Sequence, residues 1–225
     1  MTNANPFAQR STLEYELPPF AQIKEEHYLP AFYEGCAAQL AEVQAILDTP
    51  GAATFENTIV ALEKSGQYLG RVLRVFYNKS SSDTNDAIDA IEEEIAPKFA
   101  AHQDAISLNP VLFKRIKDLY DARESLGLNT EDAWLLERYY KDLIHKGAHL
   151  TEAQRDRLKE LNEELSSLQT QFSKNVLADT NDLAVLVESV EELDGLSENQ
   201  IAAAAAAAKD RGHDGKWLIG MVNFT

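Results

Sequence analysis

The sequence contains little cysteine and no long apolar run, and these two absences exclude several classes of protein. Cys36 is the only cysteine among 225 residues, so neither an intramolecular disulfide nor a cysteine-rich zinc module can form, and a reducing compartment fits best. Residues 1–12 include no apolar run of signal-peptide length, and no later stretch approaches the roughly 18 consecutive apolar residues of a membrane span. The sequence therefore predicts a cytoplasmic protein that has no membrane partner.

Positive charge is also scarce. Asp and Glu outnumber Lys and Arg by 37 to 21, which gives a formal net charge of -16. A surface of this sign repels phosphate backbones, so we expect no nucleic-acid partner. Hydrophobic residues still make up 44% of the chain, which is enough for a packed core without a metal or a disulfide.

The apolar pattern predicts a mainly α protein, a multi-helix bundle or array of antiparallel helices. In successive segments, apolar residues recur every three or four positions, which places them on one face of each helix. Aromatic residues of the fourth segment should anchor the core, and the fifth should form a helix of about 25 residues or more with a coiled-coil-like seam. The five segments carry Phe32, Cys36, Leu40, Val43 and Leu47; Ile59, Leu62, Leu69, Leu73 and Phe76; Ile88, Ile91, Ile95, Phe99 and Ile106; Trp134, Leu135, Tyr139, Tyr140 and Leu143; and Leu158, Leu161, Leu165, Leu168 and Phe172.

Start and stop signals delimit these helices. A side-chain oxygen can accept the free amide hydrogens of a first helical turn, and glycine or proline can end a helix. Pro97 should either kink the third helix or open a second one. The expected starts are Thr54, Asp83 or Thr84, Asn109-Pro110, Thr130, and the Thr151/Gln154 capping box. The expected ends are Pro50-Gly51, Asn78 with the serines at 80–82, Gly127 and Gly147.

The last part of the chain predicts a short two-stranded β element around a helix. Residues 183–187 favour a strand, Ser197 and Gln200 form a capping box before seven alanines, and residues 217–224 favour a second strand. An apolar strand at the end of a chain is an unprotected edge, so we expect further residues to pair with it. The sequence thus predicts an extended arm (1–20), a helical domain (21–180) and a strand-helix-strand segment (181–225) leading toward a missing catalytic part.

No residue of the chain is expected to be catalytic, cofactor-binding or metal-binding. His145 and His149 have the spacing of two zinc ligands on a helix, but Lys146 stands where a zinc peptidase needs a glutamate and Gly147 weakens the helix. A solvated helix end is the simpler interpretation, with adventitious metal binding as the alternative.

Other acidic and histidine positions have structural interpretations. Asp83, Asn85 and Glu94 fall at three positions of a calcium-binding loop, but no turn glycine is present, so helix capping is preferred. His102 is interpreted as a boundary histidine. The acidic runs at 92–94 and 163–164 are interpreted as solvated helix faces rather than acid-base pairs.

Several short strings, in order, resemble the N-terminal region of bacterial peptidyl-dipeptidases, in the thimet oligopeptidase family of zinc metallopeptidases. The resemblance runs from about Pro19 to Thr225. The strings are Thr54-Phe55-Glu56-Asn57-Thr58-Ile59, Glu94-Ile95-Ala96-Pro97-Lys98, Leu136-Glu137-Arg138-Tyr139-Tyr140, Gly147-Ala148-His149-Leu150, Phe172-Ser173-Lys174-Asn175 and Gly215-Lys216-Trp217.

This resemblance implies an almost wholly helical protein with two lobes flanking a channel for short peptides. The family's zinc site is an H-E-x-x-H helix plus a later glutamate, and this chain contains neither, so no functional residue is carried over. The chain would be a non-catalytic lobe forming one wall of the channel, with zinc, peptide substrates and catalysis belonging to a C-terminal part of the parent enzyme. A stand-alone helical peptide- or protein-binding module is the alternative. Apolar surface left exposed would also permit a homodimer.

Overall fold

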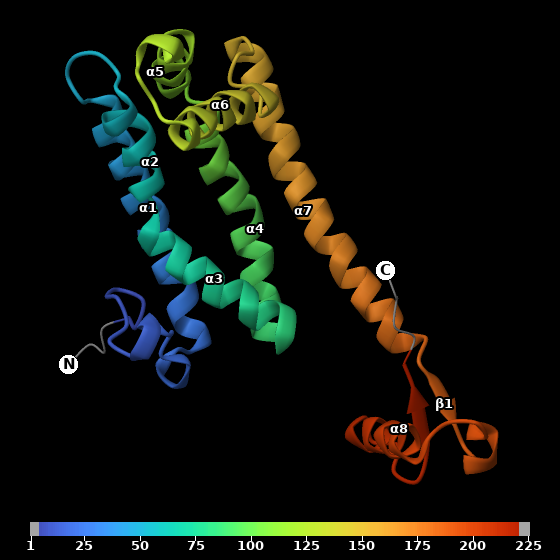
Figure 1. The fold of residues 1–225 in the computed structure, drawn as a ribbon. Coiled ribbons are helices and arrows are strands. Elements are labelled where there is room, and N and C mark those ends of the chain that lie inside the picture. Colours follow the sequence, from blue (N-terminus) through green and yellow to red (C-terminus); the bar gives the residue numbers. More distant parts are fainter. Residues whose placement is uncertain (1–4, 221–225) are drawn as a thin grey trace. The chain divides into compact units, whose positions relative to one another are not determined.

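The computed structural model describes residues 5–220, and these residues form helices with one short sheet (Figure 1). The chain divides into two compact units, Met1–Leu168 and Gln169–Thr225. The first unit consists of helices, and the second contains a two-stranded sheet. The expected mainly α fold with a short β element near the C-terminus is confirmed. The helices and strands are α1 (Tyr28–Leu47), α2 (Ala61–Lys64), α3 (Gln67–Ser82), α4 (Asp86–Ser107), α5 (Pro110–Asp121), α6 (Thr130–His145), α7 (Glu152–Asp182), β1 (Val185–Val187), α8 (Glu198–Asp210) and β2 (Trp217–Ile219).

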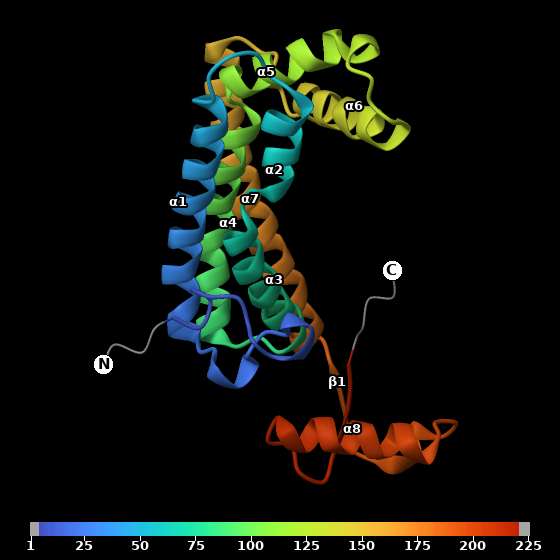
Figure 2. The same ribbon diagram turned by 60° about the vertical axis from the view of Figure 1, so that its left-hand side comes forward.

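The first core of unit 1 lies between α1, α3 and α4, which run side by side in both ribbon views (Figures 1 and 2). Ile88 and Ile95 of α4 and Phe76 of α3 are fully buried in it. Helices α1 and α3 approach closely at Gly35, where an added Cβ would lie 2.9 Å from the Leu69 Cα. Glycine at this position therefore lets two backbones pack directly against each other.

A second core joins α5 and α6 to the segment that follows α1. Ile59, Ile116 and Leu136 have no exposed surface. The rings of Tyr120 and Tyr140 stack with centroids 4.0 Å apart, which ties α5 to α6. These contacts hold α6 in place beside the rest of unit 1.

Most predicted helix starts are confirmed. Thr54 accepts from the Asn57 amide, Asn109 caps α5, and Thr151 with Gln154 forms the predicted box before α7. Two starts are corrected by one residue: Asn85 caps α4 and Asn129, not Thr130, caps α6. The amide oxygen of Asn in each case accepts from backbone N–H groups just inside the helix.

The segment predicted as one helix from Thr54 is broken. Residues Phe55–Val60 form a π-helical turn that continues into α2, and Gly66, with φ of 70°, separates α2 from α3. The left-handed backbone conformation suits glycine, and it redirects the chain. Pro97, in contrast, lies inside the continuous helix α4, so no second helix opens there.

Several predicted core positions are exposed instead. Trp134 is 60% exposed and Leu40 is 39% exposed. Along α7, Leu165 is 52% exposed and Phe172 is 69% exposed, and no described residue of this helix is buried. The expectation that Trp134 anchors the core is wrong, and the stripe of α7 is a surface feature.

An aromatic contact anchors the N-terminal arm against helix α1. Phe7 is 4% exposed and its ring lies 5.6 Å from that of Tyr28. The arm also contains short 3-10 turns at Glu14–Glu16 and Phe20–Gln22, so it is not extended throughout.

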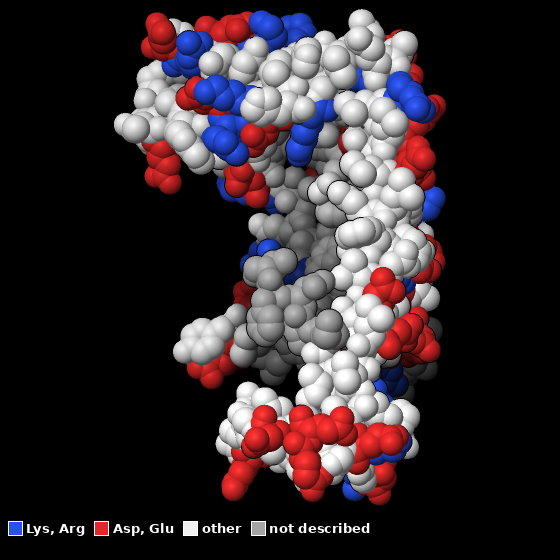
Figure 3. Space-filling model, turned by 90° about the vertical axis from the view of Figure 1, so that its right-hand side faces the viewer, with Lys and Arg blue, Asp and Glu red and all other residues white. Residues whose placement is uncertain are grey.

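Unit 2 is a strand-helix-strand element. β1 pairs antiparallel with β2, with Leu186 opposite Leu218, and Ala204 and Ala208 are the buried residues of α8. The Ser197/Gln200 box caps α8 as predicted. The predicted extension of the second strand to residue 224 lies outside the described residues from residue 221 onward. In Figure 3 acidic side chains gather over this unit, whose sequence from β1 to the start of α8 includes Glu188, Glu191, Glu192, Asp194 and Glu198.

None of the helices described between residues 5 and 220 is long and apolar enough to span a membrane.

Candidate functional site

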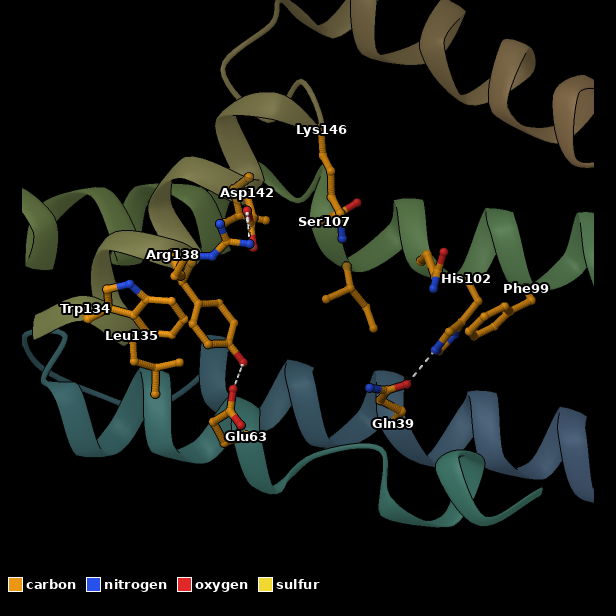
Figure 4. A pocket seen from close by; sticks show the side chains of 14 residues that line it. Gln39, Glu63, Phe99, His102, Ser107, Trp134, Leu135, Arg138, Asp142 and Lys146 are labelled. Atoms are coloured by element: carbon orange, nitrogen blue, oxygen red, sulfur yellow. Dashed lines mark hydrogen bonds and ion pairs between the residues drawn. The ribbon is translucent and has the colours of Figure 1, made fainter. Parts of the chain in front are cut away.

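A cavity of about 520 Å³ in unit 1 is lined by residues of α1, α2, α4 and α6 (Figure 4). Arg138 and Lys146 reach in from α6 and the residue after it, and Gln39 and Glu63 lie on the opposite side in Figure 4. The lining residues are Gln39, Glu63, Phe99, His102, Gln103, Ile106, Ser107, Trp134, Leu135, Arg138, Tyr139, Asp142, Leu143 and Lys146.

The α6 wall presents aromatic and charged side chains at helical spacing. Trp134, Arg138 and Asp142 are four residues apart, so they share one face of the helix. The guanidinium of Arg138 lies 5.8 Å from the Trp134 ring centroid and 3.4 Å from Asp142. The charge of Arg138 is therefore already matched within the wall.

Two side-chain hydrogen bonds cross between walls of the cavity. The hydroxyl of Tyr139 donates to Glu63 at 2.5 Å, and His102 Nε2 lies 2.7 Å from Gln39 Oε1. Burial and the neighbouring Glu63 carboxylate raise the pKa of Tyr139 far above its usual value, so this phenol remains a donor. Both bonds are drawn in Figure 4.

His102 is, with Ser107, one of two buried polar residues that line the cavity. It is 6% exposed, its ring stacks on Phe99 with centroids 6.2 Å apart, and burial lowers its pKa below 6.5. The ring is therefore neutral at neutral pH. Its Nδ1 is buried and has no hydrogen-bond partner within the part of the chain that the structure describes.

Asp104 is a second buried polar group on α4. It is 8% exposed, and both carboxylate oxygens accept from Asn162 Nδ2 of α7, at 3.0 and 2.9 Å. Desolvation raises the pKa of Asp104, and the Asn162 hydrogen bond and the charges of Lys159 and Lys146 offset this only in part.

The side chains that line the cavity include both apolar and polar groups, as in small-ligand binding sites. It combines an exposed indole, apolar side chains, amide groups and an ammonium. In residues 5–220, no group of three or more His, Cys, Asp or Glu side chains is placed to hold a metal ion. The chemistry that these residues support is recognition of a small amphiphilic group.

The two histidines considered as zinc ligands do not share a helix. His145 is the last residue of α6, Gly147 has φ of 94°, and both His145 and His149 are exposed. The predicted solvated helix end is therefore confirmed for His145.

The calcium-loop pattern is a helix start, as predicted. Asn85 accepts from the amides of Ala87 and Ile88, and Glu94 lies within α4, where it accepts from the Tyr33 hydroxyl at 2.6 Å. Glu163 and Glu164 are exposed on α7.

Sequence reasoning missed the cavity itself. His102 was expected at a boundary, but it is buried and bound to Gln39, 63 residues earlier in the chain. Trp134 was expected in the core, and it forms a wall of the cavity instead. Periodicity identifies the face that a residue occupies, but a contact of such long range leaves no local signal.

The chain is homologous to bacterial peptidases, and it spans about a third of the length of the curated relatives it matches. The dipeptidyl carboxypeptidase of Escherichia coli strain K12 is 41% identical over 100% of this chain and 33% of its own length. That of Salmonella typhimurium is 37% identical over 99% of this chain, and its oligopeptidase A is 27% identical over 91%. No protein-family model matches the chain. The predicted resemblance to the N-terminal region of bacterial peptidyl-dipeptidases is thus confirmed.

Proposed function

We propose that this chain is the N-terminal, non-catalytic helical lobe of a cytoplasmic zinc metallopeptidase that cleaves short peptides, and that it forms one wall of the substrate channel. The observation that carries the proposal is the match to dipeptidyl carboxypeptidase along the whole chain at 41% identity, over 33% of that relative. The remaining two thirds of such an enzyme would supply the catalytic groups.

The zinc of the parent enzyme does not fit the residues described here. Zinc peptidase sites use about three protein ligands around one ion. His145 and His149 lie on either side of a helix end and are exposed, and no third ligand is grouped with them in residues 5–220. The zinc would therefore be held by the C-terminal part, and the role of this lobe is to shape access to it.

The exposed apolar stripe of α7 favours a further element packed against this helix. Leu161, Leu165 and Leu168 are 44%, 52% and 58% exposed. Their spacing of four and three residues makes one continuous apolar edge, which is the pattern of a helix that packs against another element. We propose the C-terminal part of the same polypeptide as that element.

A chimaera tests this proposal. In it, the chain replaces the matched third of the Escherichia coli dipeptidyl carboxypeptidase, and release of dipeptides from a short peptide is measured. We expect the chimaera to turn over peptide and the chain alone to show none. A chimaera that folds and binds zinc but hydrolyses no peptide contradicts the proposal, as does hydrolysis by the chain alone.

The cavity described above favours a second candidate, a stand-alone peptide-binding module. Its indole, ammonium and amide groups belong to unit 1 alone, so binding by this chain needs no catalytic part. An inactive chimaera together with peptide binding by the isolated chain would support this candidate.

A further inference from the structure

We propose that the cavity between α1, α4 and α6 binds a carboxylate that adjoins an apolar side chain of a short peptide. The peptide class rests on the proposed function, whereas the recognition groups come from the cavity alone.

The charges of the cavity differ from those of the whole chain. The chain carries a formal charge of -16, but the cavity has two basic side chains, Arg138 and Lys146, and two acidic ones, Glu63 and Asp142. The acids already have partners within the walls: Asp142 pairs with Arg138, and Glu63 accepts from Tyr139. This arrangement leaves one ammonium that has no acidic partner among the lining residues, although its charge also acts on the buried Asp104 carboxyl outside the lining.

That ammonium belongs to Lys146, directly after α6. In residues 5–220 the structure records no ion pair within 4.0 Å for Lys146. Its side chain extends from the end of α6 toward Ser107 in Figure 4. An exposed ammonium next to an apolar wall attracts a carboxylate, and the surrounding acidic surface discourages an anion elsewhere on the chain.

The apolar part of the ligand would pack on Trp134. This indole is 60% exposed, although indoles are among the side chains that gain most from burial. Leu135 and Phe99 line the same cavity. A ligand side chain placed against Trp134 would cover an apolar surface that this unit leaves in water.

His102 would supply a hydrogen-bond acceptor for the backbone N–H of a peptide. Its Nε2 faces Gln39 Oε1 and so carries the proton, which leaves the buried Nδ1 as an acceptor that has no hydrogen-bond partner in residues 5–220. A buried acceptor without a donor costs free energy, so a peptide N–H that reaches Nδ1 as the ring shifts on binding would lower that cost. The volume, about 520 Å³, lies within the roughly 300–1,000 Å³ of small-ligand sites.

The binding experiment uses the full chain with Trp217→Phe, so that Trp134 alone reports by fluorescence. The probes are N-acetyl-phenylalanine, its amide, which lacks the carboxylate, and a Glu-Phe peptide blocked at both ends. We expect N-acetyl-phenylalanine or the blocked peptide to bind at least ten-fold more tightly than the amide. If N-acetyl-phenylalanine binds more tightly than the blocked peptide, the site takes a terminal carboxylate. If the blocked peptide binds more tightly, the site takes an acidic side chain.

The matched variants are Lys146→Gln and Lys141→Gln. Lys141 is also exposed on the α6 segment, but it pairs with Glu137 and does not line the cavity. Lys146→Gln should weaken the acidic probe about ten-fold and leave the amide unchanged, and Lys141→Gln should change neither. Equal binding of acid and amide, equal effects of the two variants, or no binding overturns the proposal.

A second readout concerns His102. The nitrogen NMR signal of Nδ1 should move when a probe containing an N–H group saturates the chain, and it should not move with benzoate, which has no such donor. An unchanged signal at saturation contradicts the role given to His102. Binding is measured without catalysis, so this site and the activity of the chimaera can fail independently.

Discussion

Helices α4 and α7 carry the same kind of apolar stripe, but their surroundings differ. Ile88 and Ile95 of α4 have no exposed surface, whereas Leu165 and Phe172 of α7 are 52% and 69% exposed. Helices α1 and α3 cover the stripe of α4. The difference teaches that a periodic stripe determines which face of a helix is apolar, while burial depends on what the rest of the polypeptide places against it.

The largest expected effect contrasts a core residue of α4 with a stripe residue of α7. Ile95→Ala should lower the free energy of unfolding by about 2–5 kcal/mol, because it opens a cavity in a closed core. Leu165→Ala should cost less than about 1 kcal/mol, since its side chain is already half in water. Urea denaturation followed by circular dichroism measures both. Similar losses of unfolding free energy in the two variants would show that both stripes are equally buried, which contradicts the difference between α4 and α7.

Helix capping provides a sharper comparison, because it is local and should be alike in both helices. Asn85 caps α4 and Thr151 caps α7 through backbone amides. Asn85→Ala and Thr151→Ala should each cost about 0.5–2 kcal/mol, and Asn85→Asp and Thr151→Ser should recover most of that loss. The same denaturation measurement applies. A negligible effect at Thr151 alone would mean that the first turn of α7 gains little from its cap.

The smallest effect concerns the contact that joins α4 to α7. Burial raises the pKa of Asp104 above 3.8, so the folded state holds this proton more tightly than the unfolded state does. Ionised Asp104 therefore weakens the fold at neutral pH, and this penalty fades as pH falls through the folded pKa toward 3.8. Asp104→Asn should raise the unfolding midpoint at neutral pH.

The control for Asp104 is the pH series itself, together with the partner variant Asn162→Ala. The advantage of Asp104→Asn should shrink as the pH falls and vanish below pH 3.8, where the aspartate is neutral in both the folded and the unfolded state. Asn162→Ala should be destabilising at every pH because it removes the donor to Asp104. A variant Asp104→Asn that is less stable at neutral pH would show that the charge contributes favourably.

The sequence predicted most helices because their signals are local. Asn109-Pro110 and the Thr151/Gln154 box are read within one turn, and the structure has both. Gly66 was missed because the stripe on either side of it stays in phase across the break. Local patterns thus located the elements better than the points where they bend.

The cavity could not be predicted in the same way. The spacing of Trp134, Arg138 and Asp142 is visible in the sequence, but the pairing of His102 with Gln39 joins residues of two helices. Only the packing of α1 against α4 brings these two side chains together. The resemblance to peptidyl-dipeptidases offered no help here, because it carries no functional residue onto this part of the chain.

The most direct measurement mixes this chain with the separately produced remaining two thirds of the Escherichia coli dipeptidyl carboxypeptidase. The account predicts a one-to-one complex by light scattering and hydrolysis of a short peptide that neither part performs alone. Replacing Leu161 and Leu165 with lysine should abolish both, and replacing exposed Glu163 with lysine should not. No complex, a self-associated dimer of this chain in its place, or equal effects of these substitutions would contradict the account.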